Sequence, residues 1–216
     1  MLLMKKNIII LTKSIKHGGF CVAGIDAENG QWIRLVSRDE ETEGAVPKYM
    51  LQYSDGKDLA VYDIISVELI RAVPTVVQPE NWLYDENYSW KKIGFSNLES
   101  VIKLHGFDTP EYVFENTEVS LPENWAFDGK SSLLLLKIPI SYILVKTFDN
   151  GDKKVSLNFE YNKNKYQYMS ISQKEIRDRF KIDGRHSTGS EYIVFSLTDK
   201  YYVNGKYYKV IAQILE

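Results

Sequence analysis

Residues 20–36 read FCVAGIDAENGQWIRLV, and this stretch indicates the fold most clearly. Two strand-like runs, Phe20 to Ile25 and Trp32 to Val36, flank the pair Asn29-Gly30. Asn and Gly both tolerate the positive φ that a type I′ hairpin turn requires. The stretch therefore predicts a β-hairpin near the start of the chain.

Strand signals recur along the rest of the sequence. From Val155 to Tyr161, apolar residues alternate with Ser156, Asn158 and Glu160, which is the pattern of a strand with one wet face. The 15 Tyr and 9 Phe also favour strands, because aromatic side chains pack well on a pleated surface. The sequence therefore predicts a mainly β chain.

Two short helices interrupt these strands. Residues 96–99 and 172–175 both have the spacing of a capping box, with Ser at the first position and Glu at the fourth. The chain then divides into a β unit at 1–78, an acidic, aromatic connecting segment with a short helix at 79–130, and a second β unit at 131–216. Five strands and a short helix, occurring twice, predict two small OB-like five-stranded barrels, and the fold class is mainly β with minor α content.

The net charge is only −2, but the charges are unevenly spread. Residues 1–78 hold 9 basic and 10 acidic groups, residues 79–130 hold 4 and 10, and residues 131–216 hold 14 and 9. The three parts therefore carry −1, −6 and +5. This asymmetry fits either a basic surface for an anionic partner or an acidic segment that packs against the basic unit.

A single cysteine, Cys21, excludes an internal disulfide and a Cys-built zinc site. The apolar run after Lys6 is too short for a signal peptide, and no stretch approaches the roughly 18 apolar residues that span a bilayer. We therefore expect a soluble, cytoplasmic protein with no membrane partner.

The first candidate binding site is a cationic glycine loop. Lys13, Lys16 and His17 precede or adjoin Gly18 and Gly19. Glycines can expose backbone N–H groups, and the cations add positive charge, so an anion such as phosphate can dock there. The alternative is a sharp turn between two strands.

At this loop the sequence resembles a known family. The stretch KHGGFCVAGI at residues 16–25, followed by GQWIR at 30–34, is similar to the dual-OB domain family, a bacterial group. Pro79-Glu80-Asn81-Trp82 and the ending Tyr208-Lys209-Val210-Ile211-Ala212 are also similar, although Leu35 stands where the family pattern has Pro. The resemblance covers nearly the whole chain and implies two OB-like barrels that bind nucleic acid. It implies no catalytic residues.

In the strand that begins at Trp32, Trp32 and Arg34 share one face. On an exposed barrel face, the ring can stack on a base while Arg34 pairs with a phosphate. Alternatively, Trp32 is part of the core and a nearby carboxylate holds Arg34. The sequence leaves both interpretations open.

A second candidate surface lies in the last third. Arg177, Arg179 and Arg185 surround the second helix and the polar loop after it, where they can form a cationic patch. The loop lacks the GxxxxGK[ST] signature of a P-loop. Ordinary solvated charge is the alternative.

Catalytic patterns are weaker than binding patterns. The three His lie far apart, Cys21 sits in an apolar run, and the carboxylates follow no spacing, so we expect neither an enzyme nor a metal or cofactor. The first hypothesis is a nucleic-acid-binding accessory protein whose partner is a single strand. The alternatives are a protein-interaction adaptor in a multi-gene bacterial system such as phage defence, which only the resemblance supports, and a metal-dependent nuclease.

Overall fold

The computed structural model describes residues 3–16, 18–124 and 131–215, and the chain folds into two compact units. The first unit comprises Met1–Gly106 and Lys130–Ser132, and the second comprises Phe107–Gly129 and Leu133–Glu216. The segment 79–130, which the sequence indicates as a connection, is thus divided between the units at residue 106. Its first part supplies strands to the first unit.

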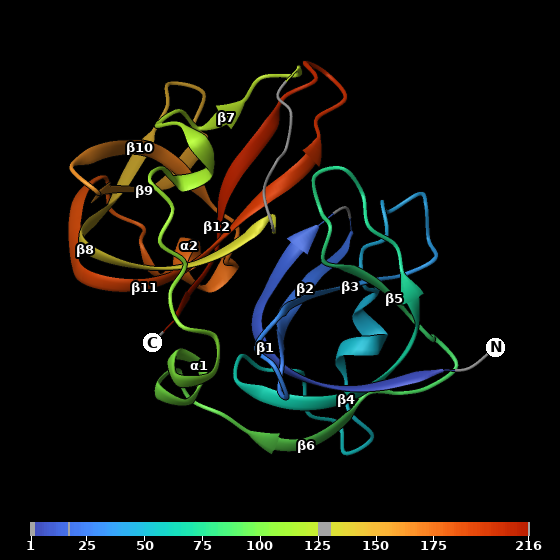
Figure 1. The fold of residues 1–216 in the computed structure, drawn as a ribbon. Coiled ribbons are helices and arrows are strands. Elements are labelled where there is room, and N and C mark those ends of the chain that lie inside the picture. The colour runs from blue at the N-terminus through green and yellow to red at the C-terminus, as the bar shows by residue number, and fades with distance from the viewer. Residues whose placement is uncertain (1–2, 17, 125–130, 216) are drawn as a thin grey trace. The chain divides into compact units, whose positions relative to one another are not determined.

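The first unit contains a closed five-stranded barrel. The order is β1-β2-β3-β5-β4, and β1 also pairs with β4, which closes the sheet (Figure 1). All of these pairings are antiparallel except that of β3 with β5. A further strand, β6, pairs with β4 beside the region that β5 covers. The elements of this unit are β1 (Met4–Lys16), β2 (Gly19–Asp26), β3 (Trp32–Val36), the 3-10 helix η1 (Lys48–Leu51), β4 (Asp63–Ala72), β5 (Asn81–Tyr84), β6 (Lys91–Phe95) and α1 (Leu98–His105).

The second unit repeats this strand order. Its sheet runs β10-β9-β8-β11-β12-β7, and a short parallel pairing joins β10 to β12. In both units the fifth strand therefore lies between the third and the fourth, as in a Greek-key OB-like barrel. The predicted fold class is confirmed. The elements are η2 (Val113–Glu115), β7 (Ser120–Leu121), β8 (Leu133–Thr147), β9 (Lys153–Tyr161), β10 (Asn164–Ile171), α2 (Lys174–Arg179), β11 (Gly184–Lys200) and β12 (Tyr207–Leu215).

Each barrel encloses its own apolar core, and a short helix between the third and fourth strands adds to it. In the first barrel, η1 contributes Met50 and Leu51 to a cluster built mainly from strand residues. In the second, the ring of Phe159 stacks on that of Tyr166 with 4.7 Å between centroids, and α2 buries Ile176. Such burial is the main favourable term in folding.

The two predicted capping boxes do not form as expected. In α1 the cap is Asn97, whose side chain accepts a hydrogen bond from the Ser100 backbone N–H at 2.8 Å, so Ser96 is not the capping residue. In α2 the N-cap is Gln173, whose Oε1 accepts from the Ile214 N–H at 3.0 Å and does not cap the helix, and the Ser172 hydroxyl donates to the Ile211 carbonyl. Among the described residues, no helix has the length and apolar character needed to cross a membrane.

Strand β9 was predicted to expose one face to water, and in the structure most of that face is buried. Ser156 and Asn158 point away from the core row of Val155, Leu157 and Phe159, yet both are buried. Register places Asn158 opposite Tyr142 on one side and beside the β10 bulge at residues 167–168 on the other. Larger neighbouring side chains therefore shield these two small ones from water.

Lys209, on β12, is a buried amine that the sequence did not single out. Its side chain is 1% exposed, and Nζ donates to the backbone carbonyl of Asn116 at 2.7 Å and to its Oδ1 at 2.6 Å. Burial lowers the pKa of Lys209 to about 7, against the opposing effect of Glu118 and Glu115. The amine holds the segment around Asn116 against the barrel.

We predict that this amine makes stability depend on pH. Because the folded-state pKa lies below that of the unfolded chain, the unfolded state binds more protons above pH 7, and the free energy of unfolding rises with pH by at most about 1.4 kcal/mol per unit. Urea unfolding of wild type and Lys209→Met at pH 7 and pH 9.5 measures this. The variant should lack the rise, and parallel profiles for the two proteins would refute the prediction.

Candidate nucleic-acid interface

The glycine loop of the first barrel is tied to its surroundings. Lys13 Nζ donates to the Leu59 carbonyl at 2.8 Å, and Lys16 Nζ donates to the Glu43 carbonyl at 2.9 Å. Gly18 has a φ of +80°, and a Cβ at Gly19 would lie 2.8 Å from the Val46 carbonyl oxygen. Both glycines are therefore required by the turn, and the two lysines anchor it. His17 lies outside the described residues.

Trp32 and Arg34 are buried, with exposed fractions of 9% and 4%. The ring of Trp32 meets His105 of α1 edge-on with 4.9 Å between centroids. Arg34 forms an ion pair with Glu80. The interpretation in which Trp32 is packed and a carboxylate holds Arg34 describes the structure, whereas stacking on a base would require both side chains to be uncovered.

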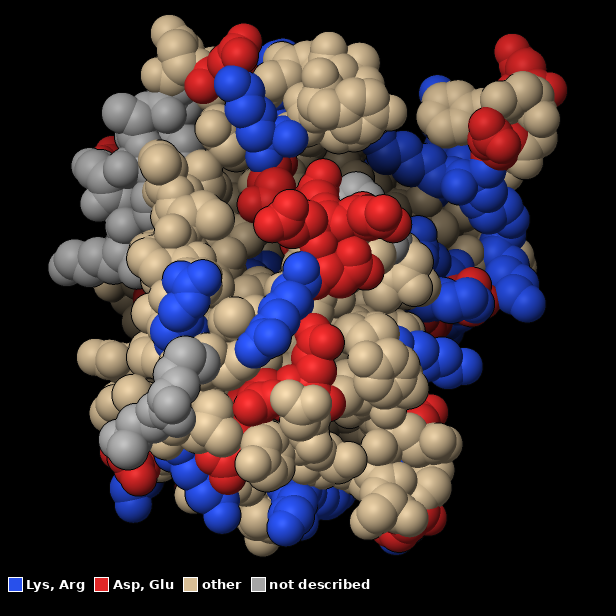
Figure 2. Space-filling view, turned by 90° about the vertical axis from the view of Figure 1, so that its right-hand side faces the viewer, with Lys and Arg blue, Asp and Glu red and all other residues tan. Residues whose placement is uncertain are grey.

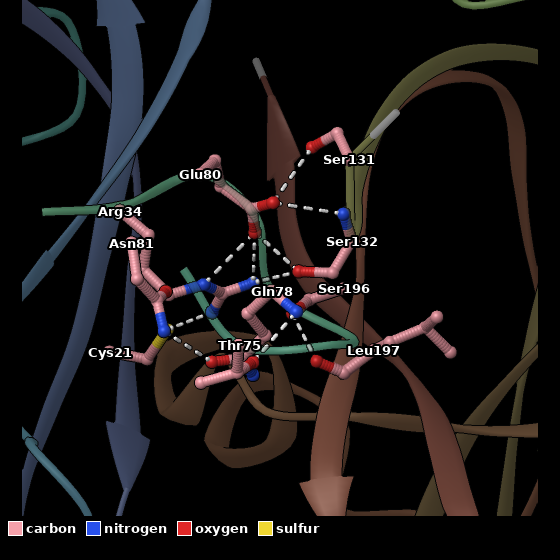
Figure 3. Close-up of polar contacts among 10 residues, drawn as sticks. All are labelled: Cys21, Arg34, Thr75, Gln78, Glu80, Asn81, Ser131, Ser132, Ser196 and Leu197. Atoms are coloured by element: carbon pink, nitrogen blue, oxygen red, sulfur yellow. Dashed lines mark hydrogen bonds and ion pairs between the residues drawn. The ribbon is translucent and has the colours of Figure 1, made fainter. Parts of the chain in front are cut away.

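The Glu80 carboxylate is the centre of the network around Arg34 (Figure 3). Arg34 Nε and Nη2 both lie 3.2 Å from Glu80 Oε1. The Ser132 hydroxyl donates to the same oxygen, while the Ser132 N–H and the Ser131 hydroxyl donate to Oε2 at 3.1 and 3.3 Å. Arg34 also donates from Nη2 to the Ser132 hydroxyl at 2.8 Å and from Nη1 to Cys21 Sγ at 2.7 Å.

This network fills the outer face of β2 and β3 with the chain's own side chains. In OB-folds, the face of the second and third strands is the usual place for a ligand. In the first barrel, the Glu80 carboxylate accepts hydrogen bonds from Arg34, as the oxygens of a bound phosphate would. Glu80 was not predicted as a site residue, although it lies in the Pro79-Glu80-Asn81-Trp82 stretch, because nothing in the sequence pairs it with an Arg 46 residues away.

The outer face of the second barrel, which includes its second and third strands β9 and β10 and extends over β8 and β11, carries aromatic and basic side chains. Tyr142 of β8 and Tyr168 of β10 flank the buried Asn158, and Lys146 pairs in register with Lys154. Arg185 of β11 is paired in register with Leu144 of β8. We call Tyr142, Lys146, Lys154, Tyr168 and Arg185 the second-barrel platform. Only Arg185 among them was a predicted site residue.

The platform side chains are held by local contacts. The Arg185 guanidinium carbon lies 3.8 Å from the centroid of the Tyr142 ring, and Lys146 Nζ lies 5.2 Å from the Phe148 ring. Tyr168 has a φ of +60°, which is uncommon for a residue other than glycine, and its N–H donates to Asn158 Oδ1 at 3.0 Å. Among the described residues, Lys146, Lys154 and Arg185 form no ion pair.

Arg177 and Arg179 lie on α2 and are exposed. In the same helix Lys174 pairs with Asp178, and the hydrogen bond from Lys174 is the main reason that the Asp178 pKa is lowered. Near the start of β11, hydrogen bonds from Thr147 lower the pKa of Asp183, so this carboxylate stays ionised there. The cations of α2 thus share their surroundings with acidic groups.

The basic excess of the last third is balanced within its own unit. The first unit holds 13 basic and 14 acidic residues, and the second holds 14 and 15, so each carries −1. The acidic residues of 107–129 belong to the second unit, where Glu123 pairs with Lys200. Figure 2 shows a compact acidic group on the face that it draws, with Lys and Arg at separate places around it. Local patches, not net charge, decide where an anion can bind.

Nearly the whole chain, residues 6–214, matches a family model described as a dual OB-containing domain. The chain belongs to the dual OB-containing domain family. Searches of curated proteins and of solved structures found no match. In this dual OB-containing chain, no group of three or more His, Cys, Asp or Glu side chains that could hold a metal ion occurs within the described ranges.

We predict that Glu80→Ala destabilises the first barrel strongly. The substitution leaves Arg34 buried without its carboxylate, and breaking one side of a buried ion pair costs about 3–5 kcal/mol. Urea unfolding should show this loss, and the double variant Arg34→Met with Glu80→Leu should recover much of it, since both charges are then removed. A loss below about 1 kcal/mol for Glu80→Ala, or a double variant as unstable as the sum of the singles, would contradict the prediction.

Proposed function

We propose that this protein is a nucleic-acid-binding accessory protein that holds a single strand on the second-barrel platform, without a catalytic step of its own. The observation that carries the proposal is the combination of the partly buried Tyr142 and the exposed Tyr168 with three cations that form no ion pair among the described residues. They share an outer face that includes β9 and β10, the second and third strands of this OB-like barrel. Proteins that bind single strands combine such stacking rings with cations that follow the phosphates.

Each platform residue has a definite part in this proposal. A base stacks on Tyr168 or on the Arg185 guanidinium, whose other side rests on Tyr142. Lys146 and Lys154 lie side by side in register and meet successive phosphates. Tyr168 has a left-handed backbone within the β10 bulge, and strained backbone of this kind clusters at ligand-binding sites.

We predict that Arg185→Ala and Tyr168→Ala each weaken binding of a single strand roughly tenfold or more, because stacking contributes about 1–3 kcal/mol per base. Fluorescence anisotropy with labelled DNA and RNA strands of about 16 nucleotides, at several salt concentrations, measures this. Arg185→Ala should also reduce the salt slope by about one.

Lys57→Ala is the matched control, since Lys57 is an exposed cation of the first barrel that pairs with Asp55. It removes the same charge and should leave affinity unchanged. No detectable binding at low salt, or equal losses for Lys57→Ala and Arg185→Ala, would refute the proposal.

A second candidate function is that of a protein-interaction adaptor. The tip of the β11–β12 hairpin favours it, because Tyr201, Tyr202 and Val203 are all exposed and Tyr202 reaches 88%. Exposed apolar groups that are contiguous often mark an interaction site. Lys200 and Lys206 flank the tip.

We predict for this candidate that Tyr202→Ser combined with Val203→Ser abolishes co-purification with the products of neighbouring genes, while anisotropy of the single strand stays at the wild-type value. If the double variant loses both strand binding and co-purification, the hairpin belongs to the nucleic-acid interface instead. Unchanged co-purification would exclude the hairpin as the docking site.

A further inference from the structure

The first barrel has a pocket beside the closed face of β2 and β3. Its volume is about 470 Å³, within the roughly 300–1,000 Å³ of small-ligand sites. Val36, Ile70, Val73 and Leu83 line it with apolar surface, and Ser37, Arg38, Glu40 and Arg71 supply its polar groups. Register pairs Leu83 with both Val36 and Arg71, so the pocket lies across β3, β5 and β4.

The walls of this pocket are fixed by hydrogen bonds. Ser37 donates from Oγ to the Ala45 carbonyl at 2.8 Å and from its backbone N–H to the Gly44 carbonyl at 2.9 Å. Val73 donates from its N–H to the Asn81 carbonyl at 2.9 Å, and the Arg38 N–H donates to Glu86 Oε1 at 3.1 Å. The pocket is therefore largely formed before any ligand arrives, which lowers the entropy cost of binding.

The two arginines give the pocket its chemistry. Arg38 and Arg71 are exposed, and neither guanidinium forms an ion pair with any residue that the structure describes. A guanidinium binds a phosphate through two parallel hydrogen bonds and also stacks on flat rings. An apolar floor beside two such groups suits a flat ring that carries a phosphate.

The neighbouring loop restricts the size of this ligand. Four exposed carboxylates are close in sequence to Arg38, namely Asp39, Glu40, Glu41 and Glu43. In the described part of the chain, Asp39, Glu40 and Glu41 form no ion pair. They would repel the run of phosphates in a polynucleotide, whereas a single phosphate between two arginines is tolerated. Glu40 can also accept hydrogen bonds from ribose hydroxyls.

We propose that this pocket binds a free nucleoside monophosphate, with the base on the apolar floor and the phosphate on Arg38 and Arg71. The site is distinct from the second-barrel platform, and it does not depend on the proposed strand-binding function. It gives the first barrel, whose usual ligand face is filled by its own side chains, a small-molecule site on β3, β5 and β4.

Isothermal titration of the full chain with each of the four ribonucleoside monophosphates at concentrations up to about 1 mM tests the proposal. We expect saturable binding of at least one of them. Inorganic phosphate and the unphosphorylated nucleoside should each bind at least about tenfold more weakly, since each lacks half of the recognised group. Absence of saturable binding for all four nucleotides would overturn the proposal.

Arg71→Gln and Arg38→Gln should each lower the affinity at least about tenfold, as expected when a charged hydrogen bond to phosphate is lost. Both side chains are exposed, so circular dichroism should show intact folding, and two separate variants guard against a local defect in one. Lys57→Gln is the control, since Lys57 is an exposed cation that pairs with Asp55 and lies outside the pocket lining, and it should bind the nucleotide as wild type does. The proposal is refuted if the two pocket variants bind the nucleotide as tightly as wild type does. It is also refuted if a single strand of about 16 nucleotides displaces the nucleotide.

Discussion

The buried ion pair between Arg34 and Glu80 holds separate segments of the first unit together. Removing two charges from water costs several kcal/mol per ion, so each must find partners inside the protein. Arg34 lies on the outward row of β3, and its partners come from the β4–β5 connection and from Ser131 and Ser132. Satisfying this one guanidinium therefore fixes where two distant segments of chain run.

The two barrels share a strand order but use their outer faces differently. In the first, a tryptophan, an arginine and a carboxylate close the face of β2 and β3. In the second, Ser156 and Asn158 are small and buried, Tyr142 beside them is partly buried, and Tyr168 is exposed. One fold thus provides one face filled by its own side chains and one face that we propose as the binding surface. The pocket beside Arg71, across β3, β5 and β4, is the proposed small-ligand site of the first barrel.

The sequence predicted much of the fold because strands and turns are local signals. The Asn29-Gly30 hairpin and the strand at 155–161 both occur, although the predicted wet face of that strand is buried, and the two-barrel class is confirmed. The site was less predictable, since burial depends on residues distant in sequence. From sequence alone Arg34 is a candidate phosphate contact, and only the structure places Glu80 beside it. The net charge of +5 in the last third is offset because the acidic residues of 107–129 belong to the same unit. Tyr142 and Lys146 carried no motif, and only strand register brings them together with Arg185.

The most direct test of this account is a map of amide chemical-shift changes in two-dimensional NMR spectra as a single strand of about 16 nucleotides is added. The account predicts the largest changes at Tyr142, Lys146, Tyr168 and Arg185, and essentially none at Ala23 and Arg34 in the closed face. Changes concentrated on β2 and β3 of the first barrel, with the second-barrel platform unaffected, would contradict it.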